Sequence, residues 1–505
     1  MSKIFENVQF NKPKKSLFDL SHEKKLTMNM GDLVPILLME TIPGDKFRVN
    51  TESLVRFAPL ISPMMHRVNS YIHFFYVPMR LVFKDYETFI TGGDDGMQTA
   101  ACPIINITAG MASQVDKGSL ADYLGLPSPP AGVIANQRTI NAMPFRAYQL
   151  IYNEYYRDQN LITKVPITTS SGLISNSGEI DATLLLRKRC WEKDYFTSCL
   201  PKSQKGNEVL LPNTVRYIDQ PLSNITAVGD AALTVMAGSN NIQADDGATP
   251  YPVQIHNIEG LDITINDLRT SARLQEFLER LARGGSRLTE VIKSFFGVES
   301  EDARLQRPEF LGGGKTPVQV SEVLSTFDST ETAGATMYGH GISAGNSNRF
   351  IKFFPEMGYV IGIMSVMPVT SYTNGMPKMF LKYDKYDYYW PTFAQLGEQE
   401  VINQEVYDSY KDSDNPTQTF GYQSRYAEYK YQPSTIHGEF KDTLDYWTMS
   451  RVFAAMPALN EQFVKADPTQ RVFSVVDPAV HKLYVQLYNN VRALRPMPYF
   501  NNPIL

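Results

Sequence analysis

The feature that most constrains the fold is that strand-like segments lie near both ends of the 505-residue chain. Residues 68–77 (VNSYIHFFYV) are rich in β-branched and aromatic side chains and precede Pro78, which is typical of a strand buried on both faces. Similar runs occur at residues 33–39, 46–49, 53–60, 359–369, 379–383, 471–476 and 482–488. Strands so far apart in sequence favour an antiparallel β-barrel or sandwich over an alternating α/β sheet.

Helices are expected between these strands. Residues 144–156 open with a proline and place aromatic side chains on one helical face. Two further helices are predicted in succession, because apolar residues recur at helical spacing before Gly284-Gly285 and again before Gly297. These apolar positions are Leu274, Phe277, Leu278, Leu281, Leu288, Val291, Ile292 and Phe295.

The composition limits the classes of function. A net charge of −5 excludes a polycation that neutralises a genome by itself, because nucleic-acid affinity comes largely from Lys and Arg displacing counterions. The 27 Phe, 28 Tyr and 3 Trp residues suit a protein with much half-buried surface, such as subunit interfaces. The N-terminal sequence lacks a secretory signal, and no apolar stretch predicts a membrane span. We expect a soluble chain that is not exported, with reduced thiols at Cys102, Cys190 and Cys199.

Motifs of enzymes and metal sites are incomplete. Residues 341–345 (GISAG) match a hydrolase nucleophile elbow, but their Gly- and Asn-rich flanks predict a loop instead of the required strand and helix. Residues 312–316 (GGGKT) resemble the end of a P-loop without its first glycine, so we expect a tight turn. No histidines have metal-ligand spacing, and the acidic pairs at 94–95 and 245–246 lack EF-hand spacing. We therefore expect no catalytic residue and no cofactor; a structural divalent cation has no support in the sequence.

Specific phrases run in order along most of the chain. They begin with FDLSHEKKLT at residues 18–27, and the most specific is ARGGSRLTEVIKSFFGVESEDARLQRPEFLGG at residues 282–313. Others lie at residues 42–45, 56–83, 89–93, 143–161 and 187–201. Together they resemble the major capsid proteins of gokushoviruses, a branch of the microviruses, which are small single-stranded DNA bacteriophages.

This resemblance implies a mainly β fold: an eight-stranded antiparallel viral jelly roll with long inserted loops and several helices. It implies a structural protein that assembles in the bacterial host cytoplasm into a small T=1 icosahedral capsid around circular single-stranded DNA. The implied partners are other copies of the chain, the DNA genome, a small basic DNA-binding protein, a scaffolding protein, a minor pilot protein and a host surface receptor. The alternatives are a receptor- or carbohydrate-binding β module and a hydrolase that uses Ser343.

Five regions are expected along the chain. Residues 1–30 predict an extended basic arm, because their lysines show no helical or alternating period. Residues 31–201 would hold the first jelly-roll strands with an inserted helix, and residues 264–355 the helical pair and loops. Residues 356–505 would hold the remaining strands and the C-terminal segment. Residues 202–263, rich in Ser, Asn, Gly, Ala and Thr, predict a surface insertion, which the resemblance makes a protrusion at the threefold axes and a place for host recognition.

Two groups of side chains are candidates for the work of a capsid. The candidate DNA-facing residues are Lys12, Lys14, Lys15, Arg187, Lys188 and Arg189, with Trp191 or Tyr195 available to stack on bases. The alternative is a solvated charged surface. The candidate subunit-interface anchors are Tyr383, Tyr386, Tyr388, Tyr389 and Trp390, because aromatic residues dominate interface energetics. The alternative is an ordinary core strand and hairpin, since alternating Tyr also suits a half-buried sheet.

Overall fold

The computed structural model describes a chain that divides into two compact units. One unit is Met1–Ser203 with Gly284–Leu505, and the other is Gln204–Arg283. The described residues are 14–130, 133–134, 136–207, 209, 232–235, 242–245, 251–252, 265–326, 334–411 and 415–500.

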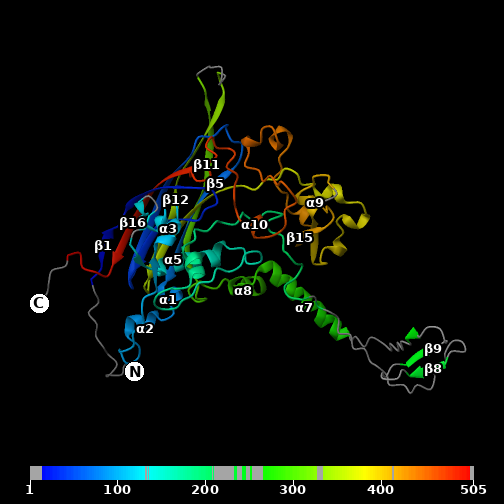
Figure 1. Cartoon of the computed structure of the whole chain (residues 1–505), viewed down its shortest axis with the longest axis horizontal. Coiled ribbons are helices and arrows are strands. Elements are labelled where there is room, and N and C mark those ends of the chain that lie inside the picture. The colour runs from blue at the N-terminus through cyan, green and yellow to red at the C-terminus, as the bar shows by residue number, and fades with distance from the viewer. Residues whose placement is uncertain are drawn as a thin grey trace. The chain divides into compact units, whose positions relative to one another are not determined.

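Nine strands of the first unit form one continuous antiparallel sheet, which curls into two halves that we call the β4 sheet and the β5 sheet. The β4 sheet contains, in spatial order, β2 (His22–Met28), β16 (Leu483–Arg495), β4 (Asp45–Phe57) and β12 (Met337–Phe354). The β5 sheet contains β3 (Val34–Thr41), β13 (Gly358–Pro368), β5 (Val68–Pro78) and β11 (Glu309–Leu324). β11 belongs to both, because its first part pairs with β5 and its last six residues pair with β12. Figure 1 shows the first and last strands side by side, with β1 (Ser16–Asp19) next to β16.

The two sheets face each other across one hydrophobic core, as in a jelly roll. Every second residue of β4 is buried, so one face of this strand meets the core and the other is exposed or half-buried. Rings from opposite sheets pack together: Phe74 lies 5.2 Å from Phe350 and Tyr76 lies 4.8 Å from Phe354, between ring centroids. The predicted mainly β fold is therefore confirmed, including the double burial of β5.

A layer of helices explains why β5 and β13 are buried on both faces. Phe75, Val77, Tyr359 and Ile361 turn away from the first core and join a second one. α5 (Met143–Ile151) and the π-helical turn η4 (Tyr152–Tyr156) supply much of this second core, which confirms the aromatic helix predicted there. The remaining short elements of this region are α1 (Met79–Val82), α2 (Tyr86–Thr91), β6 (Ile104–Ile107), η2 (Ala109–Met111), α3 (Ala112–Val115), α4 (Leu120–Leu124), β7 (Arg138–Asn141) and α6 (Ser177–Leu184).

Loops and short elements between β13 and β16 pack with residues from 161–199 to form a third, smaller core. Its centre is made by Tyr195, Phe196, Tyr372, Val401 and Phe463, among others. The elements are η5 (Lys378–Leu381), η6 (Lys385–Asp387), η7 (Pro391–Phe393), β14 (Glu398–Ile402), α9 (Asn403–Val406), β15 (Thr419–Ser424), η9 (Ala427–Tyr429), η10 (Gly438–Lys441), η11 (Asp445–Trp447) and α10 (Glu461–Val464).

The two predicted consecutive helices are present. α7 (Ile265–Gly284) ends at the first glycine of the predicted stop, and α8 (Leu288–Phe296) ends at Gly297, whose φ is 70°. Most of the predicted surface insertion, residues 202–263, lies outside the described residues. Within it, β8 (Ala232–Val235), β9 (Ile242–Asp245) and β10 (Tyr251–Pro252) form a three-stranded antiparallel sheet.

Four local predictions are wrong. Residues 379–383 lie mostly in the 3-10 helix η5, and residues 471–476 are a loop in which Phe473 makes only an isolated bridge. The glycine-rich runs at 312–316 and 341–345 were expected to be a turn and a loop, but they lie inside β11 and β12. The glycines are needed because neighbours approach closely: a Cβ on Gly313 would lie 2.4 Å from the Ile72 carbonyl oxygen. Within the predicted arm, residues 16–19 and 22–28 form β1 and β2, which pair with β16.

Candidate functional site

The predicted basic cluster is tied to the interior of the chain. The Arg187 guanidinium donates to Gln149 Oε1 at 2.8 Å and to the Ala182 carbonyl oxygen at 2.7 Å. It also lies 5.4 Å from the ring centre of Tyr152, and burial lowers the pKa of Arg187. Its hydrogen-bonding capacity is therefore used largely within the chain.

Lys188 and Arg189 also have partners inside the chain. Lys188 forms an ion pair with Asp467, and Arg189 donates to Ser365 Oγ at 3.1 Å while lying over the Tyr71 ring. Trp191 and Tyr195, the rings expected to stack on bases, are only 6% and 5% exposed. Both rings are therefore too buried to stack on bases.

The arm lysines lie differently. Lys12 is outside the described residues, and Lys14 is exposed. Lys15 is exposed too, but its Nζ donates to the Gly44 carbonyl oxygen at 2.8 Å and lies 5.3 Å from the ring centre of Phe353 on β12. The start of the described chain is thus held against the start of β4 and the end of β12.

The five predicted interface anchors form an exposed aromatic segment, residues 383–390. The side chains are exposed by 84% at Tyr383, 52% at Tyr386 and Tyr388, 50% at Tyr389 and 49% at Trp390. No strand or hairpin is present in this segment, so the alternative of an ordinary core strand is wrong. The segment contains the 3-10 turn η6, whose start is capped by the Asp384 side chain accepting the Lys385 backbone N–H.

Local contacts hold the aromatic segment in one shape. The Asp387 carboxylate accepts the backbone N–H groups of Tyr383 at 2.9 Å and Asp384 at 2.8 Å, and these bonds lower the pKa of Asp387. The Trp390 indole N–H donates to the Lys385 carbonyl oxygen at 2.8 Å. The Tyr389 ring packs edge-on against Tyr426, with centroids 4.9 Å apart. A fixed backbone therefore presents rings that are half exposed or more.

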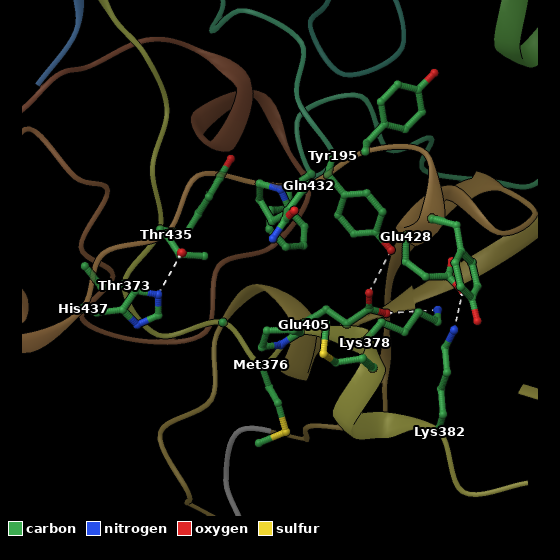
Figure 2. A pocket seen from close by; sticks show the side chains of 18 of the residues that line it. Tyr195, Thr373, Met376, Lys378, Lys382, Glu405, Glu428, Gln432, Thr435 and His437 are labelled. Atoms are coloured by element: carbon green, nitrogen blue, oxygen red, sulfur yellow. Dashed lines mark hydrogen bonds and ion pairs between the residues drawn. The ribbon is translucent and has the colours of Figure 1, made fainter. Parts of the chain in front are cut away.

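A cavity of about 310 Å³ lies beside this segment, and Tyr388 belongs to its wall. Figure 2 shows buried Glu405 between Tyr195 and Lys378: the Tyr195 hydroxyl donates to Glu405 Oε2 at 2.9 Å, and Lys378 Nζ lies 3.2 Å from Glu405 Oε1. Burial and then the Glu405 charge raise the pKa of Tyr195, so its hydroxyl stays protonated. A second pair, Lys382 with Glu428 at 3.0 Å, lies in the same wall.

The wall of this cavity is mainly apolar, and its two carboxylates, Glu405 and Glu428, are each paired with a lysine. His437 Nε2 and Thr435 Oγ1 are 2.9 Å apart, and this histidine is paired with no carboxylate that would orient it as a base. Sequence reasoning missed Glu405, Lys378 and Lys382. These residues do not form a known sequence motif, so no signal in the sequence pointed to the cavity that they line.

The residues tested as enzyme or metal motifs have structural roles. Ser343 is 3% exposed inside β12 and donates to the Pro317 carbonyl oxygen at 3.0 Å, so no nucleophile elbow is formed. His73 lies 2.9 Å from the Tyr156 hydroxyl, and burial lowers the pKa of His73 to about 4. In the part of the chain that the structure describes, no group of three or more His, Cys, Asp or Glu could hold a metal ion, and no helix is long and apolar enough to cross a membrane.

Comparison with known proteins decides between these readings. The model of the family described as "Capsid protein (F protein)" matches residues 6–505. The chain belongs to this family of microvirus capsid proteins. This capsid protein is similar to capsid protein VP1 of Chlamydia phage 1, with 34% identity over 591 aligned positions that cover 100% of this chain and 98% of that protein.

Two further relatives have nearly the same length. Capsid protein VP1 of Bdellovibrio phage phiMH2K is 34% identical over 524 positions, and that of Spiroplasma virus 4 is 29% identical over 533 positions. Each alignment covers 97% of this chain and 95% of the relative. The predicted resemblance is confirmed: the chain is a major capsid protein, a structural component of the virion and not an enzyme.

Proposed function

We propose that this capsid protein assembles into a T=1 icosahedral shell around circular single-stranded DNA, with the aromatic segment as one of its subunit contacts. The observation that carries the contact is the exposure of five neighbouring rings, from 49% at Trp390 to 84% at Tyr383. Soluble monomers rarely leave contiguous apolar patches in water, and large exposed patches mark interaction sites. A closed shell repeats heterologous contacts by rotation, so each copy needs several complementary patches.

The energetics of interfaces support this assignment. Tyr and Trp are enriched among the residues whose truncation costs most binding energy, because they bury large rigid surfaces at low entropic cost. The backbone of the aromatic segment is already fixed by Asp387 and Trp390. Little ordering of that backbone remains to be done on association, which leaves more of the contact energy for binding.

The genome needs positive charge from beyond this chain. With a net charge of −5, the capsid protein does not offset a polyanion as a whole. We infer that a small basic protein supplies much of the neutralisation, with the arm lysines Lys12, Lys14 and Lys15 contributing locally. A scaffolding protein, a minor pilot protein and a host receptor complete the proposed partners, and the insertion at 202–263 is the proposed threefold protrusion that meets the receptor.

The assembly contact is tested with the full chain carrying Tyr383→Ser and Tyr386→Ser, expressed with the scaffolding partner. Both side chains are exposed in the chain, so the urea midpoint of unfolding should stay unchanged. The yield of shells in sedimentation and negative-stain electron microscopy should fall by at least about tenfold, because truncation of an interface hot spot, a class enriched in Tyr and Trp, costs about 2 kcal/mol or more.

Tyr410→Asn is the matched control. Tyr410 is 87% exposed outside the segment, and asparagine tolerates its φ of 58°. Wild-type shell yield in the double variant would contradict the contact. A wild-type protein that stays monomeric, both when expressed with the scaffolding partner and when recovered from infected cells, would instead favour the receptor- or carbohydrate-binding module.

A further inference from the structure

The face of the β4 sheet that is turned away from the core carries a group of exposed cations. Lys46 and Arg48 lie on β4, Arg349 on β12 and Arg492 on β16, and all four are exposed. We call these four residues the cationic strip. They were not among the predicted DNA-facing residues.

Strand register places the four charges close together. Arg48 is directly opposite Arg492 on β16, and Arg349 is opposite Asn50, two residues further along β4. Lys46 precedes Arg48 by two residues on the same face. With strands about 4.8 Å apart and a rise of about 3.4 Å per residue, the Cα atoms of the strip fall within roughly 15 Å of one another.

The described part of the chain offsets these charges only in part. None of the four forms a hydrogen bond or an ion pair within 4.0 Å there, although most other Arg side chains of the sandwich and its helices do. The acid nearest in register is Asp19, which stands opposite Arg492 and accepts the Ser21 hydroxyl at 2.5 Å and the Ser21 backbone N–H at 3.0 Å. These bonds and, to a smaller extent, the Arg492 charge lower the pKa of Asp19, so this carboxylate offsets part of the positive charge of the strip. Like charges directly opposite on paired strands are destabilising, so this arrangement costs the isolated sheet stability that an anionic partner would restore.

An aromatic ring lies at one end of the strip. Phe353 on β12 is 50% exposed and stands opposite Lys46, and Lys15 of the arm lies over this ring. At the other end Tyr488 stands between Glu23 and Glu52, so the positive surface stops there. Cations beside an exposed ring are the elements of a sequence-tolerant surface for single-stranded nucleic acid, in which phosphates meet the charges and bases stack.

We propose that this face of the β4 sheet binds the phosphodiester backbone of single-stranded DNA through Lys46, Arg48, Arg349 and Arg492, with Phe353 receiving a base. The proposal rests on the proposed function, in which the shell encloses such DNA. It assigns the main protein contact to the sheet itself instead of to Arg187, Lys188 and Arg189, which are held by partners within the chain.

The test measures binding of a fluorescent oligothymidylate of about 16 nucleotides to the full-length protein by anisotropy over a series of salt concentrations. The variant carries Arg48→Gln and Arg492→Gln, and the matched control carries Lys164→Gln and Lys430→Gln, two exposed lysines elsewhere. The slope of log affinity against log salt should fall by about 1.4 in the variant, or about 0.7 for each phosphate contact, and stay unchanged in the control. The urea midpoint should be preserved or raised, because an opposed pair of like charges is removed.

Other outcomes overturn the proposal in distinguishable ways. Wild-type affinity and slope in the variant, together with weaker binding on Lys14→Gln and Lys15→Gln, would remove the strip and leave the enclosed-DNA function intact. Wild-type DNA binding with lost shell assembly would mean that the face contacts another protein chain. No binding by the wild-type protein at low salt would count against the strip and against direct genome contact alike.

Discussion

At the scale of single residues, Asp32 is a half-buried carboxyl beside Lys188. Burial raises the pKa of Asp32 to about 6, and the Lys188 charge only partly opposes this. The unfolded value is about 3.9, so between about pH 4 and pH 6 the folded state binds more protons than the unfolded state. The contribution of Asp32 to the free energy of unfolding therefore falls as pH rises through this window.

Asp32→Asn should remove this pH dependence. The variant is expected to exceed the wild type by about 2 kcal/mol in urea unfolding at pH 7 and to match it at pH 4. Asp94→Asn, at an exposed loop position, should leave the difference between the two pH values unchanged. If the wild-type protein is at least as stable as Asp32→Asn at pH 7, the prediction is wrong, and Lys188 offsets the cost of burying the ionised Asp32 carboxylate.

Residue patterns in the sequence found exposed aromatics better than exposed charges. Tyr383 to Trp390 were recognised because rings gathered in one segment are visible without knowledge of the fold. Arg187, Lys188 and Arg189 were adjacent in sequence, but their guanidinium and ammonium groups turned out to hold loops together. Lys46 and Arg48 could have been found from the alternation of apolar and polar residues along β4, which places both on its outer face. Arg349 and Arg492 join them only through pairing across the sheet, which no local pattern reveals.

At the scale of elements, the pairing of β11 with β5 depends on glycine. A Cβ on Gly313 would lie 2.4 Å from the Ile72 carbonyl oxygen and 2.7 Å from His73 Cδ2, so Gly313→Ala must push β11 away from β5. We expect a loss of about 1–3 kcal/mol in the free energy of unfolding, the usual cost of overpacking. Gly110→Ala is the control, because a Cβ there meets no atom within 4 Å. Equal unfolding midpoints for the two variants would contradict the close approach.

The same close approach explains where strand prediction failed. Glycine usually marks loops, so residues 312–316 and 341–345 were expected to leave the sheet. Inside a twisted sandwich the absence of a side chain admits a neighbour instead, as Gly341 admits the Phe57 ring. Strands with continuous apolar runs, such as β5 and β13, were predicted well because burial on both faces leaves little room for polar positions.

At the scale of the whole molecule, all eight sandwich strands belong to one unit, and Gln204–Arg283 form another. Replacement of residues 210–262 by a Gly/Ser linker should therefore leave the urea midpoint of the sandwich and the yield of shells close to wild type. Phage carrying the replacement should lose adsorption to the host, as expected for a receptor-binding protrusion. Loss of shells with an intact midpoint would assign the insertion to assembly, and normal adsorption would place host recognition elsewhere.

The pairing of β2 with β16 has a consequence for how the protein is made. Thr27 lies inside this pairing and His481 just before β16, and the two share a hydrogen bond across 454 residues of sequence. A ribosome adding about 5–20 residues per second needs roughly 20–90 s to deliver β16 after β2 has emerged. Throughout that interval β4 lacks its neighbour β16, so the backbone groups on this edge of β4 are unpaired and can bind a strand of another chain. The sandwich closes only once β16 has left the ribosome, so the nascent chain is the stage at which a chaperone has most to protect.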